Sequence, residues 1–73
     1  MEGLGPEDKI LSDREMEVLI LTVEGYDYKA IAEKLFLSNN TIRKHISNIY
    51  QKLHITSKAQ AIKYANKKGW IKN

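Results

Sequence analysis

The polar side chains of residues 38–53 are of the types that hydrogen-bond the edges of DNA bases. At about 100° per residue, one side of a helix over this segment carries Asn40, Lys44, Ser47 and Gln51, flanked by Thr41, Arg43 and Asn48. No carboxylate follows Glu33 anywhere in the chain. A helical face with Arg, Lys, Asn, Ser and Gln but no acid is suited to a polyanion, and in particular to the major groove of DNA.

The opposite side of the same segment is apolar. Ile42, Ile46, Ile49 and Leu53 recur at spacings of four, three and four residues, which predicts one buried stripe on a helix. Ser38 is the expected N-cap of this helix. His54 stands where a C-terminal cap favours glycine, although His is among the residue types better tolerated there.

Charge is divided unevenly along the chain. All nine carboxylates lie in the first 33 residues, and residues 34–73 carry nine cations. A basic half of this kind gives the positive field expected of a nucleic-acid binder. A lysine-rich solvated surface explains the same charge equally well, so charge alone does not decide the function.

Length and composition exclude several classes of protein. The 73 residues are enough for one small domain that buries about 60% of its unfolded surface. The chain has no cysteine and two histidines, so we expect no metal site and no cofactor. It has no P-loop and no nucleophile elbow, so we expect no enzyme. The absence of a long apolar run or secretory signal indicates no membrane partner and a cytoplasmic location.

Three further helices are expected around residues 38–53, and together they predict a compact all-α four-helix domain over residues 11–73. Residues 1–10 are expected to be a flexible linker or tail. The helix expected over residues 13–24 starts with a Ser12–Glu15 capping box and ends at Gly25. Its predicted buried stripe consists of Met16, Leu19, Ile20 and Val23.

The second helix is expected over residues 28–36, with Asp27 as its N-cap. The tight turn at residues 37–38 then makes a helix-turn-helix with the segment described first. The fourth helix is expected over residues 58–68, between a Ser57–Gln60 capping box and Gly69. Its inner stripe would be Ala61, Ile62 and Ala65, with Trp70 and Ile71 folding back over the core. We interpret Tyr26, Tyr28, Tyr50 and Tyr64 as packing residues, and His45 as a packed structural histidine.

The motifs taken together resemble the LuxR-type helix-turn-helix domain. They lie at residues 11–19 (LSDREMEVL), 31–35 (IAEKL), 38–49 (S-x-x-TIR-x-HISNI) and 52–53 (KL), and the likeness covers residues 11–71. The chain departs from the family at His54, where Gly is usual, at Lys58, where Arg is usual, and at Ala30, where an acid is common. None of these departures removes the DNA-reading helix.

The resemblance implies that the third helix enters the major groove and that the fourth mediates dimerisation. By position, the base-contacting residues would be Arg43, Lys44 and Ser47. Backbone contacts are expected from Lys29, Ser38, Thr41, Asn48, Lys52 and Lys58. Weak homodimerisation would use Ala61 and Tyr64, and RNA polymerase is a further candidate partner.

These observations predict sequence-specific binding of double-stranded DNA and regulation of transcription. The domain would serve as the output domain of a response regulator or as a small stand-alone regulator. One alternative is a promoter-binding module like sigma-factor region 4, which the helix after the recognition helix disfavours. Another is a helical protein-interaction adaptor that does not bind nucleic acid.

Overall fold

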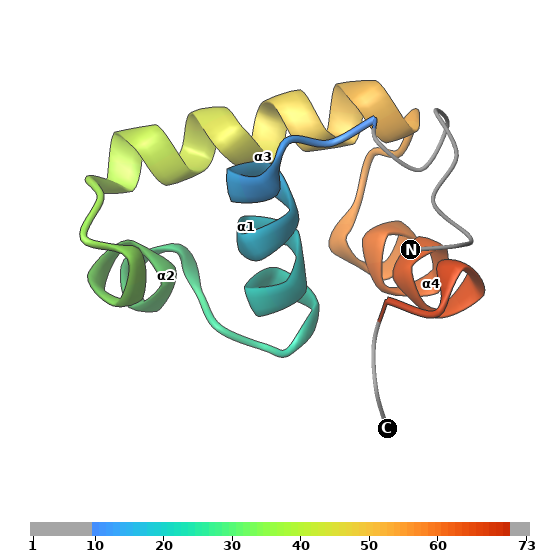
Figure 1. The fold of residues 1–73 in the computed structure, drawn as a ribbon, viewed down its shortest axis with the longest axis horizontal. Helices are drawn as coiled ribbons and strands as arrows, with labels where there is room; N and C mark the ends of the chain where they lie inside the picture. The colour runs from blue at the N-terminus through green and yellow to red at the C-terminus, as the bar shows by residue number, and fades with distance from the viewer. Residues whose placement is uncertain (1–9, 71–73) are drawn as a thin grey trace.

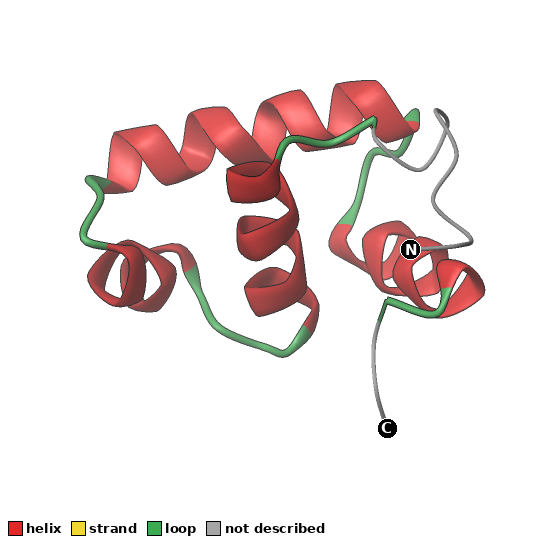
Figure 2. Cartoon of the chain, in the orientation of Figure 1, coloured by secondary structure: helices red, strands yellow, loops and turns green. Residues whose placement is uncertain are grey.

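The computed structural model describes residues 10–70, which form four helices (Figure 1). They are α1 (Asp13–Val23), α2 (Tyr28–Leu35), α3 (Asn39–Leu53) and α4 (Lys58–Lys68). Loops and turns make up the rest of the described chain, so the all-α prediction is confirmed (Figure 2). The predicted tail over residues 1–10, apart from Ile10, and the predicted position of Ile71 lie outside the described residues.

The long helix α3 runs along one edge of the molecule, and the three shorter helices lie beneath it (Figure 1). The helix α1 occupies the centre, with α2 on one side and α4 on the other. It packs against all three of the other helices. The short turn between α2 and α3 gives the predicted helix-turn-helix.

Side-chain caps begin the helices where the sequence predicts. The Ser12 hydroxyl accepts the Glu15 N–H at 3.1 Å, and Glu15 Oε1 accepts the Ser12 N–H at 2.9 Å, which completes the predicted capping box. At the start of α4, Ser57 accepts the Gln60 N–H at 3.2 Å. The side-chain oxygen of Gln60 (Oε1), however, accepts the N–H of Thr56 at 2.6 Å, one residue before the cap. In the predicted capping box, Gln60 would instead accept the N–H of Ser57. That half of the prediction is therefore wrong.

Two helices end on a non-glycine residue in the left-handed conformation. Phe36, the C-cap of α2, and His54, the C-cap of α3, both have φ of 58°. The prediction that His54 takes the place of a capping glycine is confirmed. This conformation is unfavourable for an L-residue. Phe36 is 94% exposed, so packing of its ring does little to offset that cost.

The buried stripe of α3 is confirmed, since Ile42, Ile46, Ile49 and Leu53 all lie in the core. The stripe predicted for α1 is wrong in its rotation. Apart from Leu19, its members are only partly buried, and the other buried residues are Glu15, Val18 and Thr22. The buried residues still form one stripe, but it is shifted by one position from the predicted stripe, and it includes Glu15 because Lys52 of α3 pairs with that carboxylate.

The inner side of α4 contains Ala61 and Ala65, both fully buried, and the partly buried Ile62. Ala61 was also predicted at the dimer surface, and that assignment is wrong. Its methyl group lies in the core of the monomer, where a small side chain lets α4 approach its neighbours. Tyr64 is partly buried and its ring lies 5.6 Å from that of Trp70, which packs against the core as predicted.

Candidate nucleic-acid interface

The outward face of α3 presents the polar residues that the sequence places there. Asn40, Lys44, Ser47 and Gln51 are exposed, opposite the buried stripe. The Ser38 cap holds the first turn, because its hydroxyl accepts the Thr41 N–H at 3.1 Å and lies 2.9 Å from the Thr41 hydroxyl. The helix thus stands at the surface with a fixed start and an accessible polar face.

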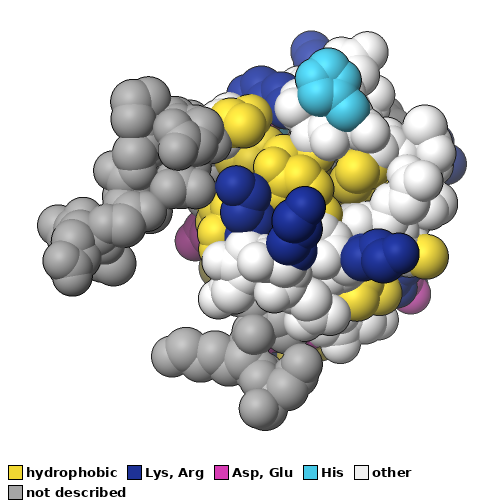
Figure 3. All heavy atoms as spheres, turned by 90° about the vertical axis from the view of Figure 1, so that its right-hand side faces the viewer, with side chains coloured by type: hydrophobic (Ala, Val, Ile, Leu, Met, Phe, Trp, Pro, Cys, Tyr) yellow, Lys and Arg dark blue, Asp and Glu magenta, His cyan; other side chains and the backbone are white. Residues whose placement is uncertain are grey.

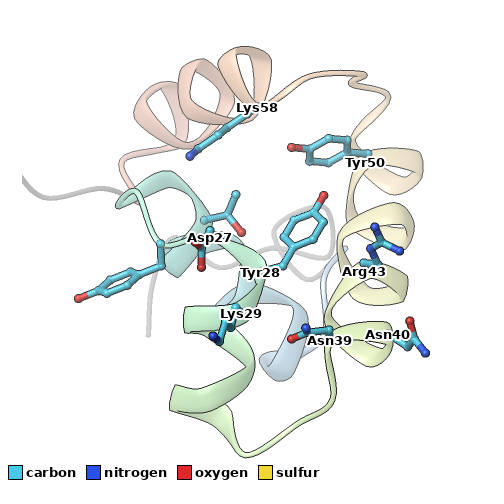
Figure 4. Close-up of a pocket in the computed structure, with 10 residues that line it drawn as sticks. Asp27, Tyr28, Lys29, Asn39, Asn40, Arg43, Tyr50 and Lys58 are labelled. Carbon is cyan, nitrogen blue, oxygen red and sulfur yellow. The ribbon is translucent and has the colours of Figure 1, made fainter.

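Beside this face lies an open hollow of about 750 Å³, which we call the three-helix hollow. It is lined by Lys29 at the start of α2, Arg43 on α3 and Lys58 at the start of α4 (Figure 4). Asn39 and Asn40, also on α3, line it as well. The fold thus brings together three cations that are far apart in sequence.

None of these three cations is neutralised by an ion pair within residues 10–70. The ion pairs of that region are Arg14–Glu17 at 3.2 Å and Lys52–Glu15 at 2.7 Å. The carboxylate that lines the hollow, Asp27, accepts the Ala30 N–H at 2.8 Å as the cap of α2. The hollow therefore keeps a positive excess, which favours an anion.

Lys52 differs from these cations because its ammonium group donates to the buried carboxylate of Glu15. Burial raises the pKa of Glu15, but the hydrogen bonds from Lys52 and from the Ser12 N–H, with the charge of Lys52, outweigh it and leave that pKa below its ordinary value. Lys52 thus joins the end of α3 to the start of α1. Its predicted contact with the DNA backbone stays a prediction, and Glu15 competes for the same ammonium group.

The remaining predicted contacts are distributed around this site. Of the six predicted backbone contacts, Lys29 and Lys58 line the hollow, and Ser38, Thr41, Asn48 and Lys52 do not. Arg43 lines the hollow and also adjoins Lys44 on the outer face, whereas Ser47 lies outside the lining. The base contacts assigned to Arg43, Lys44 and Ser47 stay predictions as well.

Three tyrosines line the hollow, Tyr26, Tyr28 and Tyr50, and the sequence predicts only a packing role for them. Tyr28 and Tyr50 both line it, from α2 and α3 respectively. The available signal was the spacing: Tyr50 follows Arg43 by seven residues, which places both on the same side of α3. The position of Tyr28 had no such signal, because it depends on how α2 sits against α3.

A helix-turn-helix with an exposed polar second helix and un-neutralised cations beside it defines a DNA-binding domain. The chain belongs to the luxR family of bacterial regulatory proteins, whose family model matches residues 9–65. The recognition made from the sequence motifs is thereby confirmed. The family match supports neither the sigma-like module nor the adaptor.

Individual regulators are similar over most of the chain. It is 43% identical over 63 residues to the transcriptional regulatory protein DegU of Brevibacillus brevis, covering 86% of this chain and 27% of that protein. It is 50% identical over 60 residues to the oxygen regulatory protein NreC of Staphylococcus carnosus, covering 82% and 28% respectively. It is 42% identical over 72 residues to the transcriptional regulatory protein DesR of Bacillus subtilis, covering 99% and 36%. The chain thus spans about a third or less of the length of these relatives.

None of the helices within residues 10–70 has both the length and the apolar character needed to cross a membrane.

Proposed function

We propose that α3 lies in the major groove of an operator, with Arg43, Lys44 and Ser47 at the base edges and Lys29 and Lys58 against the phosphate backbone. The observation that carries this proposal is the three-helix hollow, where cations from three helices flank the exposed side of α3 without ion-pair partners among residues 10–70. Phosphate contacts fix the position of the protein on the duplex, and contacts with base edges give specificity.

The test is to select a binding sequence from a random pool with the 73-residue chain and then measure affinity across a salt series. We expect the selected duplex to bind more tightly than random duplex, and both affinities to fall as salt rises. Lys58→Ala should lower the salt slope by about one unit on both duplexes. Lys34→Ala, which removes an exposed lysine of α2 outside the hollow, is the matched control. A chain that binds neither duplex at low salt would refute the proposal.

A weak dimer through α4 is part of the same proposal. The face of the molecule that bears α4 shows hydrophobic side chains interspersed with Lys and Arg (Figure 3). Tyr64, Ile55, Lys63 and Lys67 line a shallow depression there, and Tyr64 remains the proposed contact. One helix face buries less area than stable dimers need, so we expect a monomer in solution and a dimer on DNA, with half-sites about 34 Å apart. Sedimentation of a tight dimer without DNA would contradict this.

The domain is proposed to act in the cytoplasm as the output domain of a response regulator, with contact to RNA polymerase when it activates. The greater length of DegU, NreC and DesR supports a longer regulator, and a small stand-alone regulator is the alternative. Sequencing the natural reading frame decides between the two. In vitro transcription from a template with the selected operator tests the effect on polymerase.

A further inference from the structure

Two of the three tyrosines that line the three-helix hollow, Tyr28 and Tyr50, have their hydroxyl groups directed into it. Figure 4 shows the Tyr28 side chain rising from the start of α2 and the Tyr50 side chain extending from α3, with both hydroxyls directed into the space between α2, α3 and α4. Burial, and secondarily the proximity of Tyr28, raise the pKa of Tyr50. The Tyr50 hydroxyl therefore keeps its proton at neutral pH and remains a hydrogen-bond donor.

Within residues 10–70, neither hydroxyl donates a hydrogen bond to another group of the protein. Both tyrosines thus hold an unused donor at the surface, in a hollow where Lys29, Arg43 and Lys58 supply positive charge. An anion placed among these groups would meet charge from three helices and two neutral donors. Packing alone explains the rings, but it does not explain why both hydroxyls enter the hollow that Lys29, Arg43 and Lys58 line.

We infer that the hydroxyls of Tyr28 and Tyr50 form the neutral part of a seat for a phosphodiester group of the DNA backbone, whose charged part is Lys29 and Lys58. This inference rests on the proposed DNA binding and adds two residues that the sequence motifs did not single out. A phosphate in this seat would fix the strand beside α3, and with it the depth at which Lys44 and Ser47 enter the groove.

The neutral and charged parts of the seat differ in their response to salt. A lysine that contacts a phosphate releases a counterion, so its loss changes the slope of log affinity against log salt by about one unit. A hydroxyl releases none, so its loss lowers the affinity at every salt concentration and leaves the slope unchanged. A hydrogen bond to a charged group corresponds to a loss of about tenfold or more in affinity.

The test compares Tyr28→Phe and Tyr50→Phe with Tyr26→Phe, which removes a hydroxyl from a ring that lies 4.7 Å from the Lys34 ammonium group and is no part of the proposed seat. Binding to the selected and random duplexes is measured across a salt series, and thermal melting checks that each variant folds. We expect Tyr28→Phe and Tyr50→Phe each to lose about tenfold on both duplexes, with salt slopes parallel to that of the unmodified chain. Tyr26→Phe should retain the full affinity.

If the unmodified chain binds DNA and both hollow variants bind equally well, the seat is refuted and the proposed function stands. A loss of affinity with a change of about one unit in the salt slope also refutes the seat. Such a change would mean that the variants lose a cation–phosphate contact rather than a hydroxyl–phosphate contact. If the unmodified chain does not bind, the proposed function and the seat fail together. Tyr28 is 42% exposed, so Tyr28→Phe remains decisive should Tyr50→Phe lose its fold.

Discussion

Two cations of the helix α3, nine residues apart, have different surroundings. Lys52, in the last turn, donates to a carboxylate whose side chain is 7% exposed, and it joins α3 to α1. Arg43, near the start, faces an open hollow and has no ion pair with any residue between 10 and 70. Their charges are identical in a sequence count, yet only Arg43 offers an unpaired charge to a partner. We call the end of α3 at Lys52 the structural flank and the side of α3 at Arg43 the binding flank. They differ in ion pairing rather than in charge: Lys52 pairs with Glu15 of α1, and Arg43 has no ion-pair partner among residues 10–70.

The largest effect is expected from the core beneath the structural flank. Leu53, next to Lys52, is 5% exposed and belongs to the core. Leu53→Ala should lower the free energy of unfolding by about 2–5 kcal/mol, since it removes buried methyl groups and leaves a cavity. Urea denaturation measures the change. Gln51→Ala, on the exposed face of the same turn, should change it by less than about 0.5 kcal/mol. An unchanged midpoint for Leu53→Ala would mean that the buried side of α3 is assigned wrongly.

The binding flank is tested by Arg43→Ala. The guanidinium group is the best candidate for paired hydrogen bonds to guanine O6 and N7, worth about 1–3 kcal/mol of discrimination between bases. We expect the ratio of affinities for selected and random duplexes to fall, with little change in thermal stability because Arg43 is exposed. Arg43→Lys keeps the charge and removes the planar fork, so it should lose most of the same discrimination. If Arg43→Ala retains the full ratio, Arg43 serves the phosphate backbone alone.

The structural flank is tested by Lys52→Met, with Arg14→Met as its control. Lys52 is 42% exposed, so water screens part of its interaction with Glu15, and we expect a loss of about 1–2 kcal/mol at neutral pH. The Arg14–Glu17 pair has side chains 45% and 57% exposed, and its loss should cost no more than about 0.5 kcal/mol. Chemical denaturation of both variants measures the difference, and equal losses would contradict the structural role of Lys52.

The same pair sets the pH dependence of stability. Because the folded pKa of Glu15 lies below its ordinary value of 4.5, ionised Glu15 stabilises the fold above that pH. This contribution is lost as the pH falls through the folded pKa. In Lys52→Met, burial acts with less opposition and raises the pKa of Glu15, so the loss of stability on acidification should be smaller. A denaturation series from pH 7 to about pH 3 measures this, and identical pH profiles would exclude the coupling.

Much of this architecture is predictable because local signals determine it. Ser12, Asp27, Ser38 and Ser57 cap the helices as their residue types indicate, and the apolar stripe of α3 is fixed by its spacing. The rotation of α1 was not predictable from its own residues, because three neighbours surround it and Lys52 gives Glu15 a partner in the seam. Ala61 is buried because α4 packs against α1, which the sequence of α4 alone does not reveal. The three-helix hollow depends on the relative placement of α2, α3 and α4, which no local pattern encodes.

The smallest effect is expected at His54, the residue that ends α3. His54 closes the helix with φ of 58°, a conformation that costs an L-residue about 1–2 kcal/mol and glycine almost nothing. Glycine also raises the entropy of the unfolded chain, so His54→Gly should stabilise the fold by about 0.5–1 kcal/mol net. Phe36→Gly is the matched variant, with the same φ at the end of α2 and a ring that is 94% exposed. Both should raise the melting temperature by about 2–8 °C. DNA affinity of His54→Gly should not change, since neither Arg43 nor the hollow is altered. A lower melting temperature would show that the His54 side chain contributes more than its backbone conformation costs.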